Sequence, residues 1–264
     1  MTKCVDFPCM IYILLFVFGS IIGSFLNVCI YRMPRNESLV SPGSRCTSCK
    51  KSIPWYDNIP FLSYILLGGR CRFCKAKISF RYFIVELMSA SAALILYMNF
   101  GFAPKFWIYS LLTFALIVVT FIDLEFQIIP DRISIGGIFL GVISSIFIPG
   151  LHNTFTWKIG LVNSMLGMVT GGALIYLTGF LGQLAFKKES MGGGDVKLMA
   201  MIGAFLGWKM AILIFFLASF FGTPAGLYFK FVRKQDIIPY GPYLSMAAFV
   251  TMLWGNRILN LFVP

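Results

Sequence analysis

Long apolar runs separated by short polar breaks dominate the sequence. The first run, 10–31, holds 22 residues without a charged side chain, which is enough for a helix to cross the roughly 30 Å hydrocarbon core of a bilayer. A cleaved signal peptide is the alternative for this run, but the positive region before it is thin, so we expect an uncleaved helix. The runs together predict eight transmembrane helices, at 10–31, 83–100, 106–122, 133–148, 159–186, 196–208, 211–231 and 240–262.

The 196–208 run departs from the others because it has only 13 residues. A transmembrane helix needs about 20, so this segment is tilted, partly buried in protein, or joined to its neighbour. Glycine is frequent inside the runs, as at Gly167, Gly171 and Gly172, and small residues let membrane helices approach closely. We therefore expect a tightly packed helical bundle.

The composition agrees with a membrane protein. Hydrophobic residues make up 58% of the 264 residues, above the roughly 45–50% of soluble domains, and charged residues make up only 12%. The net charge of +12 could suggest a nucleic-acid partner, but the basic residues flank the apolar runs and form no long basic stretch with interleaved aromatics. We predict an all-α polytopic membrane protein whose electrostatic partner is anionic lipid, not nucleic acid.

The basic residues are distributed unevenly along the chain. Ten of the 22 Lys and Arg lie between Arg32 and Arg81. If that segment is cytoplasmic, the alternation of spans places 17 basic residues in the cytoplasm against five outside, because 123–132, 187–197 and 230–239 lie on the same side. Both termini are then outside the cytoplasm. The predicted parts are a first transmembrane segment, a cytoplasmic insertion and a helical membrane bundle, at 1–31, 32–82 and 83–264.

Four of the seven cysteines form two CxxC pairs inside the basic segment, Cys46 with Cys49 and Cys71 with Cys74. The 21 residues between the pairs are close to the spacing of four-thiolate zinc sites, which have no open coordination position. We predict a structural zinc ion that stabilises a segment too small to bury its own core. A redox-active pair is the competing interpretation. The single histidine, His152, lies in a polar break and is interpreted as a loop residue.

Two carboxylates stand at the edges of apolar runs on the predicted cytoplasmic side. Asp123 ends the third run, and Asp195 comes just before the sixth run, directly after Gly192, Gly193 and Gly194. Ionisable groups at such positions are costly, so their presence points to function.

Structural roles are the alternatives for these carboxylates. Asp195 could cap a helix after the glycine loop, and Asp131 is a natural cap after Pro130. Asp123 could pair with Arg132 near the interface. None of these roles requires chemistry.

Two neighbouring aspartates beside a flexible glycine loop can carry out aspartic proteolysis. Carboxylates within a few ångströms cannot both ionise cheaply, so one keeps its proton while the other removes a proton from water. The protonated partner polarises the scissile carbonyl, and no serine, cysteine or histidine nucleophile is needed. A proton-coupled transporter with carboxylate relays is an alternative of another class, and a zinc-stabilised scaffold without catalysis is a third.

Several longer motifs occur in a fixed order along nearly the whole chain. They comprise 23–28 with Tyr31, Arg32 and Pro34, the two CxxC pairs, 55–60, 62–64, 78–79, 81–82, 86–87, Asp123 with 130–131, and 192–198. In these motifs the sequence resembles the bacterial type IV prepilin peptidases, membrane aspartic proteases of the GxGD class. The resemblance implies a bifunctional enzyme of the bacterial cytoplasmic (inner) membrane. Such an enzyme cuts the short basic leader of a type IV prepilin or secretion pseudopilin after a glycine, then methylates the new N-terminal amine with S-adenosylmethionine.

The resemblance also assigns residues. Asp123 and Asp195 match the two catalytic aspartates, and the supporting loop comprises Gly192, Gly193, Gly194 and Lys197. The methyltransferase role is associated with the cytoplasmic segment, where the candidates are Tyr31, Arg32, Trp55, Asp57, Asn58 and Glu86. The sequence has no Rossmann fingerprint, so no donor-binding residue is assigned. Local alternatives are interfacial anchors for Trp55 and Tyr56, and a turn for Asp57 with Asn58.

Departures from the family pattern are few. Gly193 occupies the middle of the glycine motif where other residues occur, and Tyr240 stands in the 239–242 motif where Phe is common. We expect that neither departure touches a proposed catalytic carboxylate.

Overall fold

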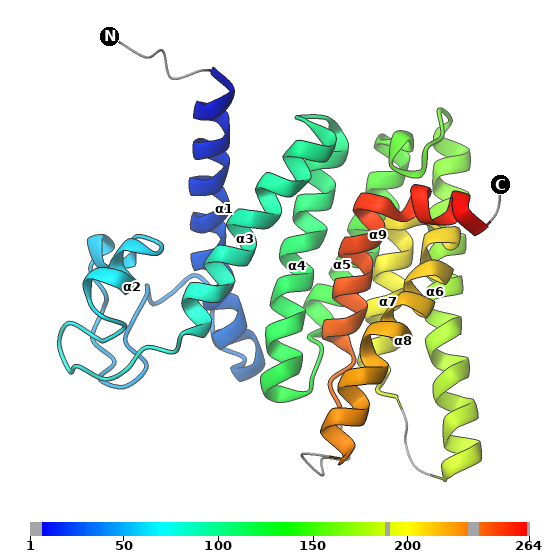
Figure 1. Cartoon of the computed structure of the whole chain (residues 1–264). Helices are drawn as coiled ribbons and strands as arrows, with labels where there is room; N and C mark the ends of the chain where they lie inside the picture. Colours follow the sequence, from blue (N-terminus) through cyan, green and yellow to red (C-terminus); the bar gives the residue numbers. More distant parts are fainter. Residues whose placement is uncertain (1–6, 188–190, 232–237, 263–264) are drawn as a thin grey trace. The chain divides into compact units, whose positions relative to one another are not determined.

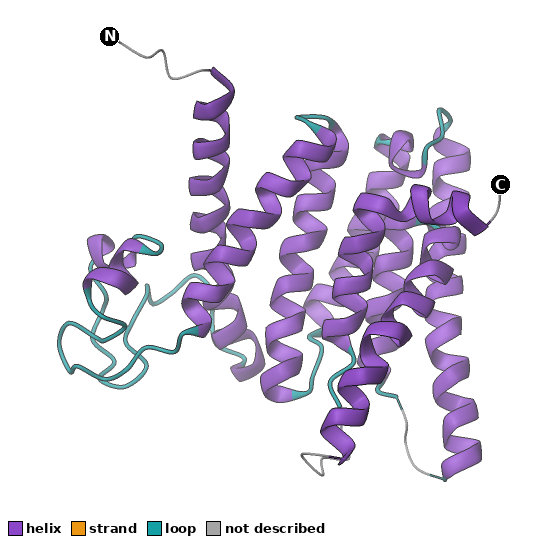
Figure 2. Cartoon of the chain, in the orientation of Figure 1, coloured by secondary structure: helices purple, strands orange, loops and turns teal. Residues whose placement is uncertain are grey.

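Helices form the regular secondary structure of the computed structural model, which describes residues 7–187, 191–231 and 238–262 (Figure 2). Within these ranges, extended backbone pairs only at two isolated β-bridges. The prediction of an all-α protein is therefore confirmed. Four basic residues used in the topology prediction, Lys3, Lys188, Arg233 and Lys234, lie outside the described residues.

Each of the eight predicted apolar runs forms one long helix. These helices are α1 (Phe7–Arg32), α3 (Arg81–Phe100), α4 (Pro104–Phe126), α5 (Asp131–Phe147), α6 (Trp157–Phe186), α7 (Gly193–Leu206), α8 (Trp208–Phe231) and α9 (Gly241–Phe262). The shorter elements are η1 (Met33–Arg35), η2 (Trp55–Asn58), α2 (Leu62–Leu66) and η3 (Pro149–His152).

Five of the described helices, α1, α3, α4, α6 and α8, are long and apolar enough to cross a bilayer. They fit a multi-pass membrane protein. The other three fall short: α5 has 17 residues, α7 has 14, and α9, with 22, is less apolar. The predicted count of eight spans is therefore not confirmed.

The chain divides into two compact units, 1–101 and 102–264. The first unit contains α1 to α3 with the cysteine-bearing segment, and the second contains α4 to α9. The predicted division into parts at 1–31, 32–82 and 83–264 stays a prediction.

In the first unit, α1 and α3 pack closely through two glycines of α1. A Cβ atom on Gly23 would lie 2.7 Å from the Cα atom of Glu86, and one on Gly19 would lie 2.7 Å from the Cα atom of Ala90. Small residues at this spacing let two apolar helices touch along their backbones. The contact fixes which turns of α1 and α3 lie level with each other.

The segment between α1 and α3 contains two turns of the same backbone form, 25 residues apart. In the first turn the N–H of Lys50 donates to the carbonyl of Cys46 at 3.0 Å, and in the second the N–H of Lys75 donates to the carbonyl of Cys71 at 3.0 Å. Lys50 and Lys75 both have positive φ, 60° and 58°, and one isolated β-bridge closes each turn. Each turn therefore presents one CxxC pair in the same way.

In the second unit, α7 is a central helix packed against α5, α6, α8 and α9 (Figure 1). Leu198, Met199, Met201 and Ile202 of α7 are fully buried. Of the three alternatives for the short 196–208 run, burial in protein is therefore the one that the structure supports.

Glycines also bring α6 and α7 together. A Cβ atom on Gly167 would overlap the carbonyl oxygen of Gly203, so only glycine fits there. Beside this contact, the hydroxyl of Ser164 donates a hydrogen bond of 2.7 Å to the carbonyl of Ala204. The predicted packing role of Gly167 is confirmed.

The end of α4 and the starts of α5 and α7 lie at one end of the second unit (Figure 1). The connection from α5 to α6 lies at the opposite end. This grouping brings the two predicted carboxylates to the same end of the helices. The side of the membrane that this end faces stays a prediction.

Candidate active site

Asp123 lies in the last turn of α4, and its side chain is buried. Its Oδ2 atom accepts a hydrogen bond of 2.9 Å from the backbone N–H of Gly241, the first residue of α9. A Cβ atom on residue 241 would lie 2.8 Å from that oxygen. Glycine is therefore needed for α9 to approach the carboxylate this closely.

Asp195 lies in the first turn of α7 and is half-buried. Its backbone N–H donates a hydrogen bond of 3.1 Å to the carbonyl of Gly192, the residue that precedes the helix. A Cβ atom on Gly194 would lie 3.0 Å from the Cβ atom of Ile129. The glycine loop therefore lets the start of α7 pack against the connection between α4 and α5.

Asp123 and Asp195 lie at the same end of the second unit, in the last turn of α4 and the first turn of α7 (Figure 1). Tyr240 lies just before α9, and its hydroxyl is 3.4 Å from the hydroxyl of Ser219. Two carboxyl groups held near each other away from bulk water cannot both ionise cheaply. Such a pair therefore tends to share one proton. The ends of α4, α7 and α9 thus lie together at one end of the second unit, with the two carboxylates (Figure 1).

The structural alternatives for these aspartates are met unevenly. α7 begins at Gly193, so Asp195 is not its N-cap residue, but the Asp195 carboxylate accepts a hydrogen bond from the backbone N–H of Gly192, the residue before the helix. The capping prediction for Asp131 is wrong because α5 begins at that residue, and its carboxylate instead accepts hydrogen bonds of 2.7 and 2.9 Å from the Nζ atom of Lys197. Among the described residues, no ion pair joins Asp123 to Arg132.

Our reading of the sequence missed the part played by the 239–242 motif. We expected that the departure at Tyr240 touches no catalytic carboxylate; its hydroxyl lies 3.4 Å from the hydroxyl of Ser219, whereas the adjacent Gly241 bonds Asp123. The expectation for Tyr240 is not contradicted, and the contact between this motif and the carboxylates comes from Gly241. A glycine placed directly before Pro242 at a helix start was the available signal, because such a glycine allows close backbone approach.

The four cysteines of the two CxxC pairs form one cluster, with all sulfur atoms within 4.8 Å of one another. The Sγ atoms of Cys46 and Cys74 are 3.8 Å apart. Two sulfurs bound to a tetrahedral zinc ion at about 2.3 Å would be about 3.8 Å apart, whereas a disulfide bond is about 2.05 Å long. The cluster could therefore hold a zinc ion.

The surroundings of Cys46 favour its metal-binding form. Burial alone would raise the pKa of this thiol, but hydrogen bonds from the backbone N–H groups of Cys49 and Ser48 and from the Cys71 and Cys49 side chains lower it, while the contacts with the other three thiols raise the pKa of Cys74. The thiolate is the form that binds zinc.

Arg32, a candidate methyltransferase residue, is buried at the end of α1. Its guanidinium donates hydrogen bonds to the carbonyls of Ser38, Pro42 and Gly43 at 2.8, 2.7 and 2.9 Å. These bonds fold the chain after α1 back onto the helix end. The contacts of Arg32 are therefore structural.

Two further candidates lie on α1 and α3. Tyr31 stacks against the guanidinium of Arg35, which lies 4.1 Å from the ring centroid. Glu86 is buried, and its Oε2 atom accepts a hydrogen bond of 2.9 Å from the backbone N–H of Phe61. Glu86 therefore fixes the chain between η2 and α2 against α3.

The remaining candidates, Trp55, Asp57 and Asn58, belong to η2. Both oxygens of Asp57 accept 2.6 Å hydrogen bonds from the Arg72 guanidinium, and this pairing lowers the pKa of Asp57. Trp55 is 81% exposed, and Asn58 is exposed beside it. The predicted turn at Asp57 and Asn58 is confirmed.

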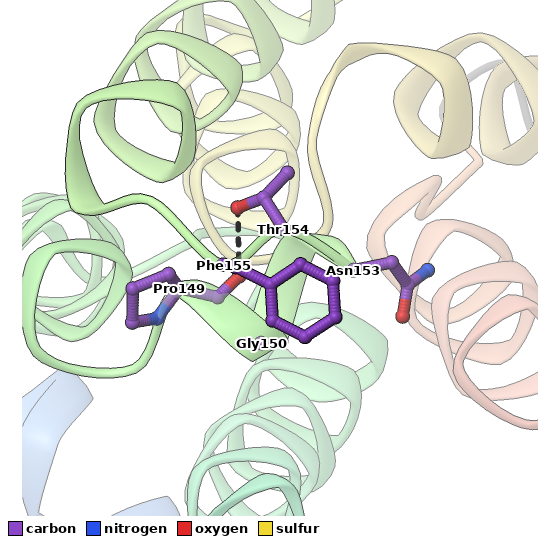
Figure 3. A pocket seen from close by; sticks show the side chains of 5 residues that line it. All are labelled: Pro149, Gly150, Asn153, Thr154 and Phe155. Atoms are coloured by element: carbon purple, nitrogen blue, oxygen red, sulfur yellow. Dashed lines mark hydrogen bonds between the residues drawn. The ribbon is translucent and has the colours of Figure 1, made fainter.

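A hollow of about 450 Å³ lies at the other end of the second unit (Figure 3). It is lined by Pro149, Gly150, Asn153, Thr154 and Phe155. The Thr154 hydroxyl is bonded to the carbonyl of Pro149 at 3.1 Å, and no carboxylate or thiol lines the hollow. The candidate site therefore stays with the aspartate pair.

Comparison with known proteins defines the class of protein. The family model described as Bacterial Peptidase A24 N-terminal domain matches residues 17–100, and the model described as Type IV leader peptidase family matches residues 110–227. Each match falls within one of the two compact units. The chain belongs to the type IV leader peptidase family.

Individual relatives extend this similarity over most of the chain. A protein of Pseudomonas putida is 33% identical over 92% of this chain and 90% of its own length. Proteins of Stutzerimonas stutzeri and Legionella pneumophila are 34% and 30% identical, over 92% and 98% of this chain and 90% and 96% of their own lengths. All three are named prepilin leader peptidase/N-methyltransferase. No solved structure gives a significant match to the chain.

Proposed function

We propose that this chain is a membrane aspartic endopeptidase that cuts the leader from type IV prepilins or pseudopilins with Asp123 and Asp195, and that it methylates the new N-terminus. The observation that carries the proposal is that Asp123, in the last turn of α4, and Asp195, in the first turn of α7, lie at the same end of the helices (Figure 1). The names of the relatives support the same substrate class.

In this mechanism the two carboxylates share one proton. The ionised carboxylate removes a proton from water as the water attacks the scissile carbonyl, and the protonated one donates to the carbonyl oxygen. The tetrahedral intermediate then breaks down as the leaving amine takes a proton from the pair. The N–H of Gly241 holds Oδ2 of Asp123 and so fixes the orientation of that carboxylate.

The position of the pair suits a substrate that is itself a membrane protein. A prepilin has a basic leader in the cytoplasm and an apolar helix in the bilayer, so its scissile bond lies at the cytoplasmic interface. Asp123 is in the last turn of an apolar span, and Asp195 is in the first turn of a buried helix. We propose that this helix end faces the cytoplasm of the bacterial inner membrane.

For methylation, S-adenosylmethionine supplies an electrophilic methyl group on a sulfonium centre. The exposed Trp55 ring and the exposed Asn58 amide are the candidates available to contact the donor, because an indole face suits a sulfonium or a purine. Arg32 and Glu86 are buried and already bonded within the segment. We assign these two a shaping role in place of donor contact.

The zinc ion has a structural role in this proposal. The sulfurs of Cys46, Cys49, Cys71 and Cys74 would occupy all four positions of a tetrahedral ion, which leaves none for water or substrate. Proteolysis by the aspartates then needs no metal. The transporter and scaffold alternatives are not pursued, because all three relatives carry a peptidase name.

Mass spectrometry of a prepilin N-terminus tests both activities at once. Purified enzyme, prepilin and methyl donor should give a product cut after the leader glycine and carrying one added methyl group. Glu37→Gln is a control carboxylate, because Glu37 pairs with Arg45 in the first unit, and this variant should still cut. An uncut prepilin would overturn the proposal, and a cut product without the methyl group would overturn its second half.

A further inference from the structure

Four apolar side chains near α2 are exposed. Their exposed fractions are 39% for Ile59, 48% for Leu62, 66% for Ile65 and 74% for Leu66. We call these four residues the apolar turn. Neighbouring exposed apolar side chains mark contact with a partner or with a membrane.

The apolar turn lies beside the middle part of α1, not beyond the C-terminal end of that helix at Arg32. Phe61, inside the turn, stacks on Phe16 of α1 with ring centroids 5.5 Å apart. Phe16 lies 16 residues before Arg32. At a rise of 1.5 Å per residue, this is about 24 Å along the axis of α1. The N–H of Phe61 bonds Glu86, which lies beside Gly23, about 13 Å from Arg32 along the helix. The turn therefore folds back alongside an apolar span.

The polar groups of the backbone here are paired within the protein. The N–H of Phe61 donates to Oε2 of Glu86 at 2.9 Å, and the N–H of Ile59 donates to the Ser63 hydroxyl at 3.1 Å. That hydroxyl in turn donates to the carbonyl of Tyr56 at 3.1 Å. Non-helical backbone is tolerated at membrane depth only when such groups find partners inside the protein.

Charge indicates which partner covers the turn. The segment 32–81 carries ten Lys and Arg against two acidic residues, Glu37 and Asp57. Both acidic residues are already in ion pairs, with Arg45 and Arg72. The excess positive charge suits anionic phospholipid headgroups, and it disfavours a basic peptide such as a prepilin leader.

We propose that the apolar turn is embedded in the lipid bilayer beside α1, with Leu62, Ile65 and Leu66 against acyl chains and the basic residues of the segment at anionic headgroups. The cysteine-bearing segment is then a membrane-anchored element. This inference does not depend on the aspartate mechanism.

Photolabelling from within the bilayer tests this proposal. The full chain is placed in nanodiscs containing phosphatidylglycerol and a phospholipid with a diazirine in its acyl chain, then irradiated and digested with trypsin. Cleavage after Lys51 and Arg70 isolates the apolar turn, and cleavage after Arg35 and Arg45 isolates Val40. Val40 is the matched control because it is 90% exposed and apolar but lies outside the turn.

We expect adducts on Leu62, Ile65 and Leu66 at a level similar to those on Ile13 and Val17, exposed residues of α1, and background labelling of Val40. Replacing phosphatidylglycerol with phosphatidylcholine should reduce labelling of the turn relative to α1. Labelling of the turn no higher than that of Val40 would overturn the proposal. It would indicate that this surface binds a protein partner instead of lipid. Labelling unchanged by the lipid exchange would overturn the headgroup contact.

Discussion

The backbone N–H of Gly241 donates a 2.9 Å hydrogen bond to Oδ2 of Asp123, so the first residue of α9 holds a carboxylate in the last turn of α4. The two residues are 118 positions apart in the chain. The orientation of the proposed catalytic carboxylate therefore depends on the packing of α9 against α4.

Gly241→Ala should reduce leader cleavage by about tenfold to a hundredfold, or roughly 1.4–2.7 kcal/mol of transition-state stabilisation. The added Cβ would lie 2.8 Å from Oδ2 of Asp123, so the carboxylate or α9 must shift. The measurement is kcat/KM on a prepilin. Gly136→Ala in α5 is the matched control, because a Cβ there meets no atom within 4 Å, and its cleavage should equal that of the wild type. Equal rates for both variants would show that the contact is unimportant.

Arg32→Lys should loosen the chain after α1. The planar guanidinium donates to three carbonyls through two nitrogens, a geometry that the single nitrogen of an ammonium does not reproduce, and the expected local cost is about 2 kcal/mol. Hydrogen exchange of residues 36–45 is the measurement, and it should become faster. Arg70→Lys, at an exposed position of the same segment, should leave exchange there unchanged. Unaltered exchange in Arg32→Lys would rule out the anchoring role.

Removal of zinc should separate the two activities. Stripping the ion with a chelator, or Cys46→Ser, should abolish N-methylation and make the segment 33–80 sensitive to protease, while leader cleavage continues. Elemental analysis should find one zinc ion per wild-type chain and a reduced amount in Cys46→Ser. Cys9→Ser is the control, because Cys9 is exposed and outside the cluster. Full zinc content and methylation in Cys46→Ser would contradict the four-thiolate site.

The sequence predicted features that depend on neighbours along the chain. Eight apolar runs became eight helices, and the two CxxC pairs met in one cluster. Contacts between distant positions were missed. Nothing local to Gly241 reveals that it bonds Asp123, and nothing local to Phe61 reveals that it stacks on Phe16.

Burial also could not be inferred from the apolar pattern alone. The run containing α7 is apolar apart from Lys197, which fits a short membrane span and a core helix equally well. Only the packing of α5, α6, α8 and α9 around it selects the core position. Asp131 was misjudged for a related reason, because its partner Lys197 lies 66 positions away.

The kinetics of Asp123→Asn, Asp195→Asn and the double variant test the central claim most directly. Residues that act as one unit are not additive, so each single variant should lose nearly all leader cleavage and the double variant should lose no more than either. All three variants should insert in the membrane and keep their zinc. A single variant that retains a substantial part of the wild-type kcat, or a double variant far slower than both singles, would contradict the shared role of the two aspartates.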